Sequence, residues 1–171
     1  MENAPPTILF VDDEVSILKA LKRLFMEEDW NLLFSDNGEE GLKILEKEEV
    51  DLVVSDVRMP GMDGIAFFRQ VKERHPSIVR VFLSGYADKM MVAQALAEGC
   101  AQQILPKPWV DSELKEVIRN ALRQSRRQRR KGADLQTLIN SLSTLPALPD
   151  TYTRLRECLA DREIYSVDRV A

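Results

Sequence analysis

Apolar residues between positions 7 and 122 form two kinds of pattern that alternate along the chain. In one they form short unbroken runs, and in the other they recur every three or four residues, the spacing of a helix. Unbroken runs of this length are typical of strands buried on both faces of a parallel sheet. They predict strands over residues 7–11, 30–34, 52–54, 78–83 and 103–105. Helical spacing predicts helices near residues 15–25, 42–45, 65–71, 92–96 and 114–122. Asn37-Gly38 is interpreted as a turn.

The alternation of five predicted strands with five predicted helices indicates an α/β fold. Right-handed crossovers between parallel strands place helices on both faces of the sheet. Chain order alone does not specify strand order, but the flavodoxin-like order 2-1-3-4-5 is common for five strands. We therefore expect a doubly wound domain over residues 1–123, with the first and third strands side by side.

Polar residues stand where four of the predicted strands end. Asp12 and Asp13 follow the first strand, and Asp56 follows the third. The fourth strand ends at Ser84, and Lys107 comes shortly after the fifth. Open α/β sheets bind ligands at the carboxyl ends of their strands. The expected strand order would bring all of these groups into one crevice.

Asp56 lies between an apolar run and a segment rich in turn residues. The run covers residues 52–54, and the turn segment 59–64 reads MPGMDG. Asp63 in that segment is a suitable N-cap for the following helix. Asp56 is therefore expected on the loop that leaves a central strand. The alternative is an aspartate that only caps its own loop, because aspartate is common in turns.

Three carboxylates in one crevice require compensation. Two like charges about 4 Å apart repel by roughly 4 kcal/mol at an effective dielectric near 20, so a cation or a raised pKa is needed. Mg²⁺ is expected because it binds carboxylate, carbonyl and water oxygens and shares them with phosphate. Asp56 would then remain nucleophilic, while Lys107 and Ser84 would contact phosphoryl oxygens.

The phosphoryl group is expected to arrive on another molecule. The sequence lacks the glycine-rich Walker A loop that would hold a nucleotide. Its single histidine, His75, argues against a phosphohistidine of the chain's own and against zinc chemistry. A turnover enzyme is not expected either, because Val57 and Arg58 offer no additional general acid beside Asp56.

The sequence resembles the receiver domain of bacterial two-component response regulators over about residues 7–123. The features that carry the resemblance, in chain order, are Asp12-Asp13, Asp56 with the 59–64 segment, the 83–86 segment LSGY, and Lys107-Pro108. The resemblance implies that Asp56 accepts a phosphoryl group from a sensor histidine kinase. It also implies that Lys107 pairs with that group, that its peptide bond to Pro108 is cis, and that Ser84 moves inward on phosphorylation.

The resemblance further implies a Mg²⁺ site. Asp13, Asp56 and the backbone carbonyl of Arg58 would be its ligands, and Asp12 would act through a water molecule. Members of this family commonly carry an aromatic residue three places before the lysine. Here that position holds Ile104, so the aromatic half of the usual switch is in question.

Two other side chains are expected to modulate the site. Arg58 lies two residues beyond Asp56, and Tyr86 lies two residues beyond Ser84. Our hypothesis is that both control the access of water, and hence the lifetime of an aspartyl phosphate. The alternative for Tyr86 is a loop aromatic that rests on the fourth helix.

The segment 123–131 contains six basic residues and no acid, although the whole chain has a net charge of −4. Nucleic-acid binding is one interpretation, but neither aromatic residues nor a recognisable recognition helix accompany the run. A solvated helical linker over residues 124–144 is favoured. Its apolar stripe, which must be buried against the receiver, the next domain or a second copy, consists of Leu135, Leu138, Ile139, Leu142 and Leu145.

Residues 145–171 resemble the start of an HDOD domain, a helical relative of the HD phosphohydrolases that lacks their metal ligands. The last predicted helix is cut off at Ala171 after barely one turn, so we expect a fragment of a longer protein. The apolar runs are far shorter than the roughly 20 residues of a membrane span. The first residues lack the pattern of a secretion signal. A cytoplasmic protein without a membrane partner is therefore expected.

The expected function is a phosphorylation-operated response regulator that controls its own C-terminal output domain. Phosphorylation would shift the surface formed by the fourth helix, fifth strand and fifth helix. A homodimer through this surface, or through the linker helices, is a further expectation. The alternatives are a scaffold of the same fold that never gains phosphate, and a nucleic-acid binder that uses residues 123–131.

Overall fold

Five parallel strands form the centre of the chain. The computed structural model describes residues 4–143, with side chains through residue 141. Its strands are β1 (Thr7–Val11), β2 (Asn31–Ser35), β3 (Leu52–Asp56), β4 (Val79–Ser84) and β5 (Gln103–Pro106). They pair in the order β2-β1-β3-β4-β5. The predicted strand order is confirmed, and β1 and β3 lie side by side.

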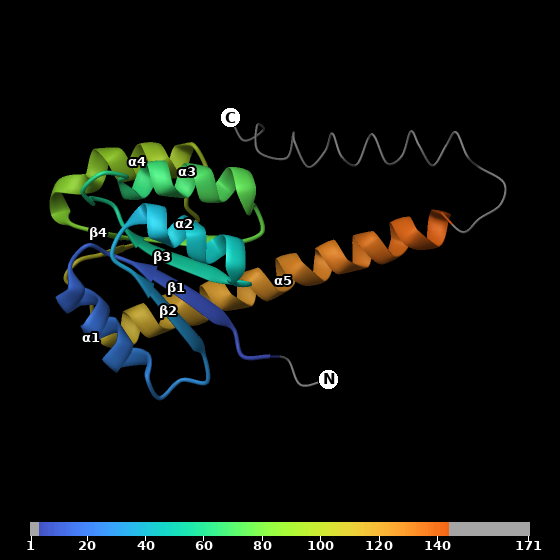
Figure 1. Ribbon diagram of the computed structural model, residues 1–171, viewed down its shortest axis with the longest axis horizontal. Coiled ribbons are helices and arrows are strands. Elements are labelled where there is room, and N and C mark those ends of the chain that lie inside the picture. The colour runs from blue at the N-terminus through green and yellow to red at the C-terminus, as the bar shows by residue number, and fades with distance from the viewer. Residues whose placement is uncertain (1–3, 144–171) are drawn as a thin grey trace. The chain divides into compact units, whose positions relative to one another are not determined.

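Helices cover both faces of this sheet. They are α1 (Val15–Phe25), α2 (Gly38–Lys47), α3 (Gly64–Arg74), α4 (Lys89–Ala97) and α5 (Asp111–Ser143), with a short 3-10 helix, η1, over Tyr86–Asp88. Figure 1 shows α2, α3 and α4 on one side of the sheet, with α1 and the first part of α5 on the other. The expected doubly wound α/β architecture is therefore confirmed.

The core consists of two apolar layers separated by the sheet. One layer packs under α2, α3 and α4 and includes Phe68 and Phe82, whose ring centroids are 4.4 Å apart. The other packs under α1 and α5 and includes Phe10 and Phe25, whose ring centroids are 5.7 Å apart. Every residue of β3 is buried. Burial on both faces explains why this strand is an unbroken apolar run up to Ser55 and Asp56.

Short polar residues and glycine set the ends of the helices. Asp63 is the N-cap of α3, as predicted, and accepts a hydrogen bond from the backbone N–H of Ala66. Gly99 ends α4 with a φ of +67°, a conformation that favours glycine. Asn37 and Gly38 do not form a separate turn. Asn37 is instead the N-cap of α2, where its side chain accepts from the N–H of Glu40.

The helix α5 continues without interruption through the predicted linker as far as Ser143. The chain divides into two compact units, the first ending at Arg127 and the second beginning at Gln128. In the second unit, Leu135 and Leu138 of the predicted apolar stripe are exposed. The HDOD-like segment expected at residues 145–171 lies outside the described residues. Among the described residues, no helix is long and apolar enough to cross a membrane.

Gly64 allows α3 to start directly against the backbone of β3. Its N–H donates to the carbonyl oxygen of Val57 over 2.8 Å. A Cβ atom at this position would lie 2.0 Å from the carbonyl oxygen of Asp56. Only glycine fits this approach, so the residue holds the loop after Asp56 in place.

Replacing Gly64 with alanine should lower the free energy of unfolding by at least about 2 kcal/mol, because the added methyl group meets backbone atoms that cannot move independently of the core. Chemical denaturation monitored by circular dichroism measures the change. Gly132→Ala is the matched control, since a Cβ there meets nothing within 4 Å and alanine favours a helix. A Gly64→Ala protein as stable as the control variant would contradict the steric explanation.

Candidate functional site

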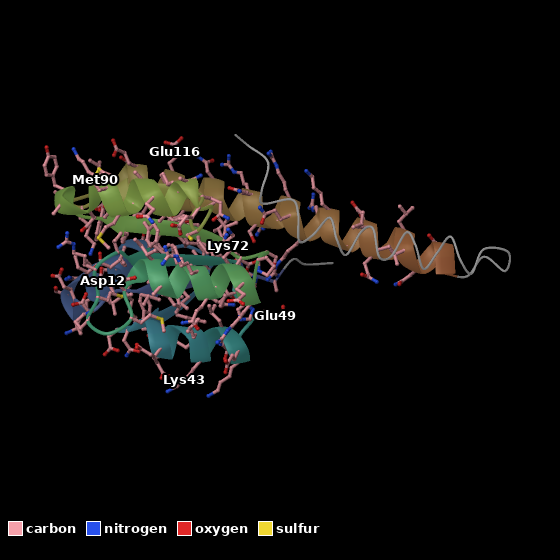
Figure 2. All side chains as sticks on the ribbon, turned by 90° about the horizontal axis from the view of Figure 1, so that it is seen from above. Asp12, Lys43, Glu49, Lys72, Met90 and Glu116 are labelled. Atoms are coloured by element: carbon pink, nitrogen blue, oxygen red, sulfur yellow. The ribbon has the colours of Figure 1, made fainter. Side chains whose placement is uncertain are left out.

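Three aspartates meet at the carboxyl edge of the sheet, as predicted. Val11 of β1 pairs with Ser55 of β3, so the next residues, Asp12 and Asp56, leave neighbouring strands together. One carboxylate oxygen from each of Asp12, Asp13 and Asp56 lies within 4.8 Å of the others. Asp12 and Asp56 are buried, at 1% and 7% exposure, whereas Asp13 is exposed. Figure 2 shows Asp12 among the loops at one end of the sheet.

Lys107 reaches this cluster from the end of β5. Its Nζ lies 2.7 Å from Oδ2 of Asp12 and 3.2 Å from Oδ1 of Asp56. The backbone N–H of Lys107 donates to the carbonyl oxygen of Ser84 over 2.8 Å, which extends the pairing of β4 with β5. The lysine stem is therefore fixed by the sheet, and its ammonium group bridges two buried carboxylates.

Backbone N–H groups fix the orientation of the two buried acids. Glu14 N–H donates to Oδ1 of Asp12 over 2.9 Å, and Val57 N–H donates to Oδ1 of Asp56 over 2.8 Å. The lysine therefore contacts the same Asp56 oxygen that Val57 binds. Among residues 4–143, Oδ2 of Asp56 accepts no hydrogen bond, which leaves one carboxylate oxygen available for chemistry.

Burial is the main electrostatic influence on Asp56. It raises the pKa of this carboxyl group; Lys107 opposes the shift, and the neighbouring Asp12 adds to it. Burial also acts to lower the pKa of Lys107, but the hydrogen bond and charge of Asp12, together with the charge of Asp56, outweigh it and raise the pKa overall. The ionised form of Asp56 is thus less favourable than it is in water, whereas the ammonium form of Lys107 is more favourable.

The donor set fits a small divalent cation. Three carboxylates and one ammonium group leave a net charge of −2 when all are ionised. The available ligand atoms are hard oxygens, and their mutual distances allow a single ion to contact all three side chains. Oxygen ligands of this kind suit Mg²⁺. The residues present are therefore compatible with the predicted magnesium site.

Ser84 and Ile104 lie at the edge of a cleft. The Ser84 hydroxyl donates to the carbonyl oxygen of Gly85 over 3.1 Å. The cleft has a volume of about 330 Å³, is lined mainly by apolar atoms, and reaches from these two residues to Lys107 and α4. Ile104 is only partly buried there. Open space therefore lies beside Ile104, the position where the resemblance led us to expect an aromatic residue.

Arg58 and Tyr86, the two predicted modulating residues, point to other partners in this structure. The guanidinium of Arg58 forms an ion pair with Asp88. Tyr86 is 83% exposed, and Nζ of Lys89 lies 3.9 Å from the centre of its ring. The ring therefore contacts the side chain of the first residue of α4. The Lys107–Pro108 peptide bond is cis, as predicted.

Comparison with protein families matches residues 8–119 to the response regulator receiver domain. The chain belongs to this family. In response regulators such a receiver domain interacts with sensor histidine kinases and is joined to an output domain. The resemblance expected from the four motifs is therefore confirmed for the receiver domain, while the HDOD-like segment is not covered by the match.

Similar proteins include regulators of transcription. The receiver domain is 34% identical over 122 residues to the hydrogenase transcriptional regulatory protein HoxA of Cupriavidus necator, covering 71% of this chain and 25% of that protein. It is 34% identical over 112 residues to the DNA-binding transcriptional regulator NtrC of Escherichia coli, covering 66% of this chain and 24% of that protein. The chain thus spans about a quarter of the length of these relatives.

Solved structures give the same result. The signal receiver domain of an HD domain-containing protein from Pseudomonas fluorescens Pf-5 has a TM-score of 0.69 and 35% identity, covering 71% of this chain and 98% of that one. A structure described as adenylate cyclase from Rhodopirellula baltica has a TM-score of 0.74 and 28% identity, covering 77% of this chain and 98% of that one. Each likeness covers 98% of the solved chain, but only 77% and 71% of this one.

Asp88 is the residue of this receiver domain that the sequence analysis missed. In the structure it is buried in η1, and it binds both Arg58 and the backbone N–H of Gly85. The only signal in the sequence was an acid three residues after Ser84-Gly85, a spacing that is equally typical of a simple helix start.

Replacing Asp56 with asparagine should raise the free energy of unfolding at neutral pH without Mg²⁺ by about 1 kcal/mol, the scale of a single polar substitution. The pKa of Asp56 is raised in the folded state, so the stabilising protonated form is lost as pH rises from about 3.9, the value for unfolded chains, through the folded value. Urea denaturation at pH 7 measures the difference.

Asp29→Asn, a change at an exposed carboxylate, should leave stability unchanged and serves as the control. Adding Mg²⁺ should stabilise the unmutated chain more than Asp56→Asn, because the ion compensates charges that the variant lacks. A destabilised Asp56→Asn protein would show that the contacts of Asp56 with Lys107 and Val57 outweigh the cost of its burial.

Proposed function

We propose that the chain is a phosphorylation-operated receiver in which Asp56 accepts a phosphoryl group from a sensor histidine kinase. The observation that carries this proposal is the placement of Asp56. It is a buried carboxylate with one oxygen held by Val57 and Lys107 and the other without a hydrogen bond among the described residues. A nucleophile held in this way beside a fixed cation suits phosphoryl transfer.

The transfer proceeds at the oxygen of Asp56 that has no protein donor. This oxygen attacks phosphorus, the P–N bond to the donor imidazole breaks, and the electron pair leaves on that nitrogen. Lys107 already lies within contact distance of Asp56, so its ammonium group is positioned to pair with the negative charge that gathers on the phosphoryl oxygens. Ser84 supplies a hydroxyl from the neighbouring strand end once it turns from the carbonyl of Gly85.

The proposed magnesium ligands are the side chains of Asp13 and Asp56 and the backbone carbonyl of Arg58, with Asp12 acting through water. When bound, Mg²⁺ would neutralise charge shared between the carboxylates and the incoming phosphoryl group. The exposure of Asp13 supports this assignment, because an exposed carboxylate can turn toward an ion without breaking a buried contact. Asp12, by contrast, is occupied by Lys107 and the N–H of Glu14.

Regulation is proposed to act through the face formed by α4, β5 and the first part of α5. Ile104 lines the cleft on this face, at a position where members of the family commonly carry an aromatic residue. Arg58 and Tyr86 are proposed to control the access of water. This regulation is proposed to control a C-terminal output domain of the HDOD type. It is also proposed to act on a homodimer, in which the second copy of the chain binds through this face or through the linker helices. The HD domain-containing relative supports an output of this kind. A cytoplasmic location is part of the same proposal.

Incubation with Mg²⁺ and a small phosphodonor should add the mass of one phosphoryl group to the unmutated chain, as measured by intact-protein mass spectrometry. Asp56→Asn should gain none, because it lacks the attacking carboxylate. Asp29→Asn should gain as much as the unmutated chain. Phosphate on Asp56→Asn would show that another residue accepts the group and would contradict the proposal. Phosphate on none of the three chains would favour the alternative scaffold that never gains phosphate.

Replacing Lys107 with alanine should slow phosphorylation by about 100-fold, by analogy with the loss of a single charge-stabilising donor. The same change should strengthen Mg²⁺ binding, because it removes a competing cation that lies 2.7 Å from Asp12. Phosphorylation rates and Mg²⁺ titration by tryptophan fluorescence measure the two effects. Lys43→Ala, which removes an exposed lysine from α2, is the control, and a Lys107→Ala chain with weakened Mg²⁺ binding would contradict this account.

A further inference from the structure

An ion pair connects the loops that leave β3 and β4. Nε of Arg58 donates to Oδ1 of Asp88, and Nη2 of Arg58 lies 3.4 Å from the carbonyl oxygen of Ala87. The two side chains are in different surroundings, since that of Arg58 is 61% exposed and that of Asp88 only 6%. The pair therefore combines a buried acid, which needs a partner, with a guanidinium group that water can reach.

The second carboxylate oxygen of Asp88 fixes the loop after Ser84. Oδ2 accepts from the backbone N–H of Gly85 over 2.9 Å, and the N–H of Asp88 donates to the carbonyl oxygen of Gly85 over 3.2 Å. One carboxylate therefore links the residue two places after Asp56 to the residue directly after Ser84. The start of α4, at Lys89, follows immediately.

The carboxyl end of α4 is held by other contacts. Nε of the buried Arg80 donates to the carbonyl oxygen of Cys100 over 2.7 Å. Nζ of Lys72 donates to the carbonyl oxygen of Glu98 over 2.7 Å, and Arg69 of α3 pairs with the Glu98 side chain. Figure 2 shows Met90, near the start of α4, toward the same end as Asp12, and Lys72 farther along the molecule. Of these contacts, only the one at the amino end thus involves the loop that follows Asp56.

There is room for the amino end of α4 to move. The cleft of about 330 Å³ lies beside it and is lined by Tyr86, Lys89, Val92 and Ile104. Within α4 itself only Val92 and Ala95 are buried. A shift of the first turn therefore displaces few core side chains, whereas a shift of the last turn would break the contacts of Arg80 and Lys72.

We propose that Asp88 is a positioning residue for Arg58 and that their ion pair holds the amino end of α4 in its unphosphorylated position. The inference rests on the proposed function at Asp56. A phosphoryl group there carries a charge of about −1.5 to −2, which exceeds that of the Asp88 carboxylate. The guanidinium group, which suits bidentate contact with phosphoryl oxygens, leaves Asp88, and the first turn of α4 moves while its last turn stays in place.

The restraint is tested first without any phosphodonor. In Asp88→Asn and in Arg58→Gln, amide hydrogens in residues 86–92 should exchange about three- to tenfold faster than in the unmutated chain, because the amino end of α4 loses its ion pair. Amides in residues 96–100 should be unchanged. Glu98→Gln, which breaks the ion pair with Arg69 at the other end of α4, is the matched control and should leave residues 86–92 unchanged.

The positioning role is tested on the phosphorylated chain. Asp88→Asn should lengthen the lifetime of the aspartyl phosphate about threefold or more, since Arg58 no longer has a competing partner, and Arg58→Gln should shorten it. The double variant should behave as Arg58→Gln, because the effect of Asp88 requires Arg58. Arg58→Lys, which keeps the charge but not the bidentate geometry, should give an intermediate lifetime.

Independent, additive effects of the two substitutions on the lifetime would overturn the positioning role. Equal exchange of residues 86–92 in all variants would overturn the restraint on α4. If the exchange difference is present but the unmutated chain gains no phosphoryl group, the proposed function fails while the restraint stands, so the two results are distinguishable.

Discussion

Lys107 lies between two buried carboxylates, 2.7 Å from Asp12 and 3.2 Å from Asp56, and the rest of the site depends on this bridge. The three residues come from the ends of β1, β3 and β5, which meet only when the sheet is complete. The bridge is therefore a product of the whole fold. A cation held in place by the backbone of β5 lets two acids approach that would otherwise repel one another.

The compensation that Lys107 supplies is incomplete. The pKa of Asp56 is raised because burial outweighs the attraction of the lysine, and the exposed Asp13 adds a further negative charge beside it. Local repulsion of this kind costs stability, which the two apolar layers on either side of the sheet offset. It also gives the site its chemistry, since a divalent ion or a bound group that contacts these oxygens relieves the repulsion and is favoured for that reason.

The five strands and the gathering of their carboxyl ends could be predicted because both follow from regular patterns, whereas the sheet order was taken from the order that is common for five strands. Alternating apolar runs define the strands, and parallel connections then place every strand end at one edge. Asn37-Gly38 was misread because the same two residues suit a turn and the start of a helix. The close approach of Gly64 to the carbonyl of Asp56 was missed as well, since a glycine in a turn segment has an adequate local explanation.

The pairing of Arg58 with Asp88 had no such pattern, because it joins two loops across 30 residues of sequence. Its importance follows from the weak packing of α4, which buries two side chains beside an open cleft. A helix with a large apolar face would be fixed by that face and would not respond to a change in charge. Because α4 has little apolar burial, polar contacts at its two ends decide its position.

The two ends of α4 differ in where these contacts come from. The contacts at its carboxyl end come from α3 and β4, away from the acids. The contact at its amino end comes from Arg58, two residues after Asp56. A charge gained at Asp56, as proposed, would therefore act on one end of the helix alone, and this asymmetry would convert a local electrostatic change into a directed movement.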